Sequence, residues 1–166
     1  MNGGVLQEAS SPPALTEPDD VRVARAAHLN VLLLADRNLA ALESICATGG
    51  LTHQRYVVLW TLCLADEPAR GIPLGAIADG LLNRASDVTR LVDRLERDGL
   101  AERLANPDDR RSVLVRATAA GHRAFAAVTP RLQRFHREQW SNLADDEIGT
   151  LDRLLAKALW GGDGDG

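Results

Sequence analysis

A run of arginines and small polar residues between positions 84 and 97 has the residue types that read nucleic-acid bases. The side chains of interest are Arg84, Ser86, Asp87, Thr89, Arg90 and Arg94. Arginine can donate two parallel hydrogen bonds to O6 and N7 of guanine, and serine or threonine can bind a base or a phosphate. Asp87 has two interpretations, since its carboxylate can accept from a cytosine amine or cap a helix and hold Arg90. These residue types favour contact with double-stranded DNA.

A second pair of arginines, Arg110 and Arg111, lies in a polar turn between two short apolar segments. A hairpin tip with this charge can enter the minor groove, whose narrow form attracts arginine. Asp109 precedes Arg111 by two residues, and we expect its carboxylate to fold back and hold that guanidinium. The alternative is an ordinary polar turn with no partner.

Surface ion pairs are the alternative explanation for the first group of charges. Asp87, Arg90 and Asp93 are spaced three residues apart, at which opposite charges attract each other on a helix. These charges alone favour neither interpretation, and the arginine pair in the turn shifts the balance toward DNA contact.

The elements that must position these arginines follow from the apolar pattern. Apolar residues at three- and four-residue steps predict a long first helix, three shorter helices and two further helices at the end. The first, second, third, fifth and last of these helices begin at about Asp20, Thr52, Pro73, Thr118 and Asp145, and the fourth carries the apolar face that starts at Val88. Gly49 and Gly50 end the first helix, and Gly99 ends the fourth. The period changes over 100–105 and 112–117, which predicts a hairpin.

Two short helices, a tight connection and a hairpin, in this order, make a winged helix-turn-helix. The fourth helix must seat an apolar face on the third helix and turn its polar face toward base edges. Its apolar positions are Val88, Leu91, Val92 and Leu95. We therefore predict a mainly α fold with a small β-hairpin wing.

The sequence resembles the MarR family of transcription regulators over about residues 51–159. The resemblance is most specific in Val-Thr-Arg-Leu-Val-Asp-Arg-Leu-Glu at 88–96, followed by Gly99-Leu100 and Arg103. The wing pattern of the family, D-x-R and then T-x-x-G after a strand, is met by Asp109, Arg111, Thr118 and Gly121. Leu82-Asn83 stands where such motifs commonly have a turn glycine.

The resemblance implies a homodimer whose first and last helices intertwine, and which represses transcription until a small ligand binds. It divides the chain into tails at 1–19 and 161–166, a DNA-binding lobe at about 52–118, and dimerisation helices at about 20–48 and 119–160. The two long helices independently carry more apolar surface than one lobe can cover. A two-fold dimer is expected to bind an inverted-repeat operator.

The resemblance also implies an effector pocket between the dimerisation helices and the DNA-binding lobe. We expect parts of the first, second and fifth helices to line it. Four nearby residues could grip an aromatic or anionic molecule: His28, Arg55, Tyr56 and Trp60. The competing expectations are that Trp60 packs in the core and that Arg55 is exposed to solvent.

Composition and motifs disfavour other classes of protein. The 166 residues carry a net charge of −4, but the segment 84–116 has a net charge of +1. The sequence has no Walker loop, no G-x-G-x-x-G and no nucleophile elbow, so we expect neither an enzyme nor a cofactor. The four histidines match no metal motif. No apolar run approaches about 18 residues and no signal peptide is recognisable, which predicts a cytoplasmic protein.

Cys46 and Cys63 match no zinc or disulfide motif, and both lie within apolar patterns. We expect buried, inert thiols rather than redox sensors. The remaining alternative function is a dimeric protein-interaction module, or a metal- or redox-sensing module, that has this fold without ordinary operator binding.

Overall fold

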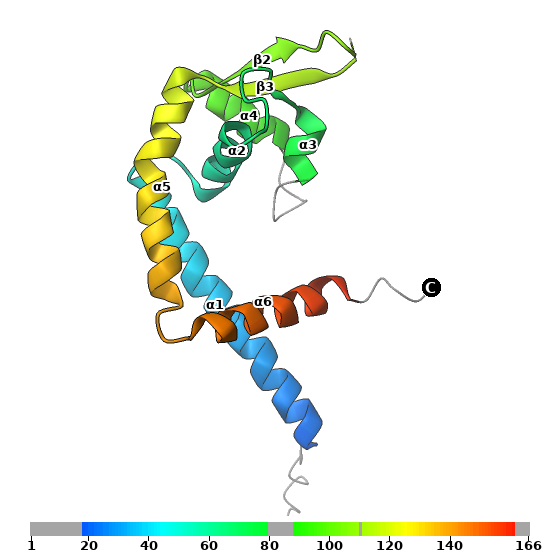
Figure 1. The fold of residues 1–166 in the computed structure, drawn as a ribbon, viewed down its shortest axis with the longest axis vertical. Helices are drawn as coiled ribbons and strands as arrows, with labels where there is room; N and C mark the ends of the chain where they lie inside the picture. The colour runs from blue at the N-terminus through cyan, green and yellow to red at the C-terminus, as the bar shows by residue number, and fades with distance from the viewer. Residues whose placement is uncertain (1–17, 80–87, 110, 162–166) are drawn as a thin grey trace, which may run out of the picture. The chain divides into compact units, whose positions relative to one another are not determined.

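The computed structural model describes residues 18–79, 88–109 and 111–161, in which it has six helices and three strands (Figure 1). The elements are α1 (Asp19–Ala47), α2 (His53–Cys63), β1 (Ile72–Pro73), α3 (Leu74–Asp79), α4 (Val88–Arg97), β2 (Ala101–Ala105), β3 (Val113–Ala117), α5 (Ala119–Gln139) and α6 (Asp145–Trp160). Arg84, Ser86, Asp87 and Arg110 lie outside the described residues, as do most of the two predicted tails. The chain divides into two units, residues 1–39 and 40–166.

The first unit contains α1 as far as Leu39. The helix begins and ends as the sequence predicts. Most of its large apolar side chains are exposed, as Val23, Leu29, Leu32 and Leu33 illustrate. A helix with apolar side chains over so wide an arc is typical of one that another surface covers.

The core of the second unit forms around α2. Val58, Leu59 and Leu62 of this helix are buried and belong to one apolar cluster with Val92 of α4 and Val128 of α5. The helix contacts α4, α5 and β3, which surround it in Figure 1. Removing apolar surface from water stabilises the fold by about 25 cal/mol per Å².

The wing is a three-stranded antiparallel sheet with the strand order β1-β3-β2. In the predicted hairpin, Arg103 lies opposite Val115. The third strand, β1, was not predicted. Pro73 is tolerated in it because β1 is an edge strand, where a missing N–H leaves no ladder bond broken. Val115 and Ala117 are buried, whereas Val113, which alternation places on the same face of β3, is exposed.

Two threonines cap helices of the second unit. The hydroxyl of Thr52 accepts a hydrogen bond from the backbone N–H of Arg55 at 3.3 Å, and that of Thr118 accepts one from Gly121 at 3.1 Å. Both caps confirm the sequence prediction. Among the described residues, no helix is long and apolar enough to cross a membrane.

Candidate nucleic-acid interface and pocket

The outward face of α4 carries those predicted recognition residues that the structure describes, Thr89, Arg90 and Arg94. Val88, Leu91, Val92 and Leu95 are buried, as predicted from their spacing. At about 100° per residue, this buried stripe turns Thr89 and Arg90 outward, and both are exposed. The predicted separation of an apolar and a polar face on this helix is therefore confirmed.

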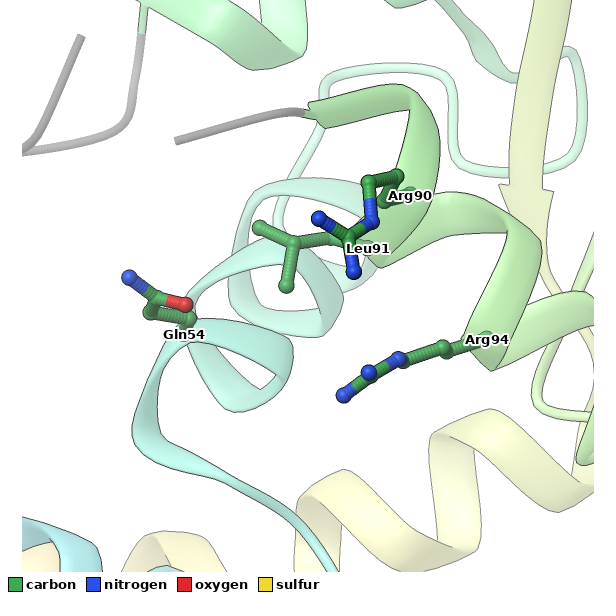
Figure 2. Close-up of a pocket in the computed structure, with 4 residues that line it drawn as sticks. All are labelled: Gln54, Arg90, Leu91 and Arg94. Carbon is green, nitrogen blue, oxygen red and sulfur yellow. The ribbon is translucent and has the colours of Figure 1, made fainter. Parts of the chain in front are cut away.

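A hollow of about 200 Å³ lies between α4 and the first turn of α2. It is lined by Gln54, Arg90, Leu91 and Arg94, with Arg90 and Arg94 one turn apart on α4 (Figure 2). Gln54 enters this surface from α2 and was not among the residues predicted from the sequence. Its place in the first turn of α2, two residues after the Thr52 cap, could have indicated this role. Residues of a first turn lie beside unpaired backbone N–H groups, which favour anions such as phosphate.

Arg103 of β2 joins the wing to α4. Its Nη2 atom donates to Asp93 at 2.6 Å, and its Nη1 atom donates to Glu96 at 2.5 Å. Burial lowers the pKa of the Arg103 guanidinium, but the hydrogen bonds and charges of the two carboxylates outweigh burial, and the net pKa is raised. Asp93, expected as a possible partner of Arg90 on the same helix, binds this arginine of the wing.

Hydrogen bonds within the wing tip hold its backbone. The Asp109 carboxylate accepts from the backbone N–H of Arg111 at 2.9 Å, and Asn106 donates to the Ser112 hydroxyl at 2.6 Å. The contact from Asp109 is thus with the backbone of Arg111, whereas the sequence predicted one with its guanidinium. The Arg111 residue is exposed.

Two arginines tie the wing to the loop after α2. Arg70 pairs with Asp108 in the tip, and Arg116 donates to the Ala69 carbonyl at 3.0 Å and to Glu102 at 2.7 Å. Neither arginine has a signal in the sequence, because the partners of both are far away in the chain.

A separate pocket of about 310 Å³ lies between the end of α1, α2 and α5. Its lining residues are Leu42, His53, Tyr56, Val57, Trp60, Thr129, Leu132, Gln133 and His136. Tyr56 stacks on Phe125 with 5.5 Å between ring centroids, and its hydroxyl lies 3.1 Å from that of Thr129. Burial raises the pKa of Tyr56. The three helices are those expected to line an effector pocket.

The four residues expected to grip a ligand occupy different places. Tyr56 and Trp60 line the pocket together, and His28 is an exposed residue of the first unit. Trp60 is 48% exposed, so the expectation that it packs in the core is wrong. Arg55 is 9% exposed, so the expectation that it faces solvent is also wrong.

Arg55 turns away from the pocket lining and toward the end of α4. Its Nη2 atom pairs with Asp98, and its Nη1 atom lies 3.5 Å from the Gly50 carbonyl oxygen. Its Nε atom is buried without a hydrogen-bond partner among the described residues. The physical cause of the wrong expectation is this distant acidic partner, which allows a guanidinium to be buried.

His53 and His136 face the same pocket from α2 and α5. Burial lowers the pKa of His53, the Glu43 carboxylate raises it, and His136 lowers it further. The Glu43 carboxylate also accepts a hydrogen bond from the backbone N–H of His53 at 2.8 Å. The described residues contain no group of three or more metal-ligating side chains that could hold an ion.

The two thiols lie in apolar surroundings. Cys46 is fully buried and Cys63 is half-buried. Burial raises the pKa of each to about 11, with a contribution from Glu43 at Cys46. Since the thiolate is the reactive form, both side chains are protonated and slow to react near neutral pH.

Residues 51–113 match the model of the MarR family. The multiple antibiotic resistance protein MarR of Escherichia coli (strain K12) is 43% identical over 77 residues, which is 43% of this chain and 51% of the relative. This chain thus spans about half the length of that curated relative. A MarR transcription factor from Planctomyces limnophilus has a solved structure that is 34% identical, with a TM-score of 0.61, 79% of this chain and 93% of that chain being covered.

A further similar structure is a cysteine-to-serine variant of MarR from Escherichia coli complexed with operator DNA. It is 28% identical, with a TM-score of 0.69, and the match covers 85% of this chain and 96% of that chain. The similarity therefore extends beyond residues 51–113, which the family model matches.

Proposed function

The chain belongs to the MarR family of transcription regulators, and on this premise we propose that it is a ligand-responsive repressor in the cytoplasm. In this proposal a homodimer binds an inverted-repeat operator in double-stranded DNA and is released by a small aromatic or anionic molecule. The family membership confirms the resemblance seen in the sequence. It also confirms the predictions of a winged helix-turn-helix fold and of a regulator rather than an enzyme.

The observation that carries the proposal is the arginine face of α4. Arg90 and Arg94 lie one turn apart beside Gln54, while the opposite face of the helix is fixed in the core. A helix held in this way can enter a major groove as a rigid body, with forked donors toward guanine or phosphate. In the complex of the Escherichia coli variant, the bound partner is operator DNA.

The homodimer is supported by apolar surface at both ends of the chain. The α6 helix has no buried residue, and Leu154, Leu159 and Trp160 are all more than half exposed. Together with the exposed apolar residues of α1, these side chains form more apolar surface than a monomer in water usually leaves open. Light scattering at micromolar concentration tests this step, and a well-folded monomer would contradict it.

DNA recognition is tested by selection from a randomised duplex library at one fixed salt concentration. The wild-type protein should recover an inverted repeat with half-sites about 34–36 Å apart. Arg90→Ala should lower affinity by roughly 1–3 kcal/mol per half-site and relax preference at one position if Arg90 forks onto a guanine. A nearly uniform loss across sequences would assign it to phosphate, and unchanged binding would assign it to a surface ion-pair network.

A matched control for this selection is Arg137→Ala. Arg137 is an exposed arginine in the last turn of α5, so this change removes the same charge away from the arginine face of α4. It should recover the wild-type sequence with nearly wild-type affinity. Recovery of no palindrome by the wild-type protein would overturn the dimeric repressor and favour a dimeric interaction module of the same fold.

The pocket between α1, α2 and α5 supports the ligand response. Tyr56 and Trp60 offer an aromatic wall, and the imidazole N–H groups of His53 and His136 can donate hydrogen bonds to an anion. Benzoate, a planar aromatic carboxylate, is a suitable probe. It should change tryptophan fluorescence in the wild type and not in Trp60→Phe, and it should weaken binding to the selected DNA. If benzoate changed neither the fluorescence nor the DNA affinity, aromatic carboxylates would be excluded as ligands of this pocket.

A further inference from the structure

Three consecutive residues of α2 face three different parts of the second unit. Gln54 lines the hollow that also contains Arg90 and Arg94 of α4. Arg55 pairs with Asp98, and Tyr56 stacks on Phe125 of α5. Successive side chains on a helix point about 100° apart, so a single turn of α2 can hold all three directions at once. This turn therefore joins the arginine face of α4 to the pocket against α5.

Arg55 is the charged member of this turn, and its burial is unusual. Its side chain is 10% exposed, whereas that of its partner Asp98 is 53% exposed. The buried Nε atom has no hydrogen-bond partner among the described residues. An unsatisfied buried donor costs free energy, and an apolar side chain at this position would avoid that cost. Stability alone therefore does not explain why a charged side chain occupies this position.

Asp98 directly follows the last residue of α4. Its backbone N–H donates to the Arg94 carbonyl at 3.1 Å, and the N–H of Leu100 donates to the Leu95 carbonyl at 2.8 Å. Gly99, between them, has a φ of +68°, which a glycine adopts without strain. Arg55 thus grips the helix at the point where the chain turns from α4 into β2.

We propose that Arg55 is a positioning residue for DNA recognition, which sets the place of α4 along its own axis by holding Asp98. The inference rests on the proposed operator binding. Leu91 and Leu95 keep α4 against the core, but apolar burial has no direction. The ion pairs of Arg103 with Asp93 and Glu96 join α4 to the wing and not to α2, so a small slide of α4 against α2 remains possible without a further contact. A directed ion pair at the end of the helix prevents that slide, and so presents Arg90 and Arg94 at one level to the bases.

Removing the Asp98 carboxylate can change DNA affinity in two ways, by loss of its charge or by loss of the position of α4, and these two changes have opposite signs. Asp98 carries a negative charge close to the proposed interface, so its removal favours DNA by charge alone. Loss of positioning lowers affinity for the operator, because the base contacts depend on it, and does not lower affinity for unrelated DNA. The ratio of the two affinities therefore measures positioning directly.

The experiment compares Asp98→Asn with the wild type on DNA selected by the wild-type protein and on an unrelated duplex. We expect a roughly fivefold loss of affinity for the selected DNA, with unrelated DNA bound equally or more tightly. Asp98→Glu retains the carboxylate and should recover most of the loss. The control, Asp19→Asn, removes a carboxylate from the exposed pair with Arg22 and should leave the ratio unchanged. Equal or tighter binding of the selected DNA by Asp98→Asn would overturn the proposal.

Amide hydrogen exchange tests the same contact without DNA, so failure of operator binding would be recognised separately. In Asp98→Asn the amide of Leu100, which closes the end of α4, should exchange roughly tenfold faster than in Asp19→Asn. Core amides of α5, such as that of Leu132, should be unaffected, which excludes global destabilisation. Unchanged exchange at Leu100 would overturn the role of Arg55, whatever DNA the wild type selects.

Discussion

The carbonyl oxygen of Leu100 occupies the space in which a side chain on Gly121 would begin, since a Cβ built there would lie 2.0 Å from that oxygen. The first turn of α5 therefore packs directly on the backbone between α4 and β2. Thr118 completes the junction, because its hydroxyl accepts from the N–H of Gly121 and donates to the Gly99 carbonyl at 2.6 Å. The T-x-x-G spacing thus has a physical reason, a cap and a close approach in one turn.

Gly121→Ala should lower the free energy of unfolding by about 2 kcal/mol or more, because the added methyl group must displace backbone atoms. Urea unfolding followed by circular dichroism measures the change. Gly149→Ala in α6 is the matched control, since nothing lies within 4 Å of its Cβ position. It should be neutral or stabilising by up to about 1 kcal/mol, as alanine favours a helix. Equal effects of the two substitutions would contradict the close approach.

Arg103→Lys should weaken the connection between the wing and α4. A lysine ammonium cannot hold Asp93 and Glu96 with the fixed fork that the guanidinium supplies. Because both carboxylates are partly exposed, we expect a loss of only about 0.5–1 kcal/mol of stability. Denaturation with Asp93→Asn, alone and combined with Arg103→Lys, measures the coupling. Arg22→Lys, in an exposed pair on α1, should cause almost no loss. If the losses of stability from Arg103→Lys and Asp93→Asn were strictly additive, the two side chains would not be coupled, which would contradict the prediction.

Local signals explain which parts of the fold the sequence predicts well. The Thr52 and Thr118 caps depend on residues three positions away, and the buried stripe of α4 depends on neighbouring turns. The short strand β1 has no such signal, because its two residues become a strand only by pairing with β3. The arginine face of α4 was likewise predictable, whereas Gln54 joins it through the packing of α2 on α4.

The burial of Arg55 and the exposure of Trp60 show where sequence patterns fail in the site. Every residue of α2 from Tyr56 to Trp60 is apolar, so the spacing of apolar residues does not indicate which face of the helix is buried. The partner that allows Arg55 to be buried lies 43 positions away at Asp98. Asp93 similarly finds Arg103 across an element boundary, although Arg90 is nearer in sequence. Charges on a helix face predict that ion pairs form, but tertiary packing chooses the partners.

His53 should make stability depend on pH. Its pKa in the folded chain is lowered from 6.5, chiefly by burial, so the unfolded chain binds the proton more readily in the window just below 6.5. The contribution of His53 is therefore complete above that pH, and it is lost as pH falls through the window toward the folded pKa. Urea unfolding at about pH 8 and about pH 5.5 measures it.

In this comparison, His53→Gln should reduce the loss of stability between the two pH values. His122→Gln is the control, because His122 is an exposed histidine of α5. The same pH dependence in His53→Gln and wild type would contradict the assignment.

Binding of an anion such as benzoate should tighten as pH falls, since a protonated imidazole attracts a carboxylate, and His53→Gln should weaken this trend.

Arg111→Ala should weaken DNA binding broadly and reduce its dependence on salt. The side chain is exposed at the wing tip, where it would supply charge to the minor groove rather than read one base. If it neutralises one phosphate, the slope of log affinity against log salt should fall by about 0.9 per subunit. Titrations of the selected DNA at several salt concentrations measure the slope, and wild-type binding by the variant at every salt concentration would contradict the wing assignment.

Asp109 provides the matched test for how that arginine is held. Its carboxylate accepts from the backbone N–H of Arg111, so Asp109→Asn, which keeps an oxygen acceptor, should preserve the turn. This variant should bind DNA as well as the wild type, or more tightly because a negative charge is gone. Asp109→Ala loses the acceptor and should weaken binding while retaining the salt slope, because Arg111 keeps its charge. If Asp109→Asn lost affinity as Asp109→Ala does, the carboxylate would act on the Arg111 guanidinium through its charge, and the backbone contact would not be what positions the wing arginine.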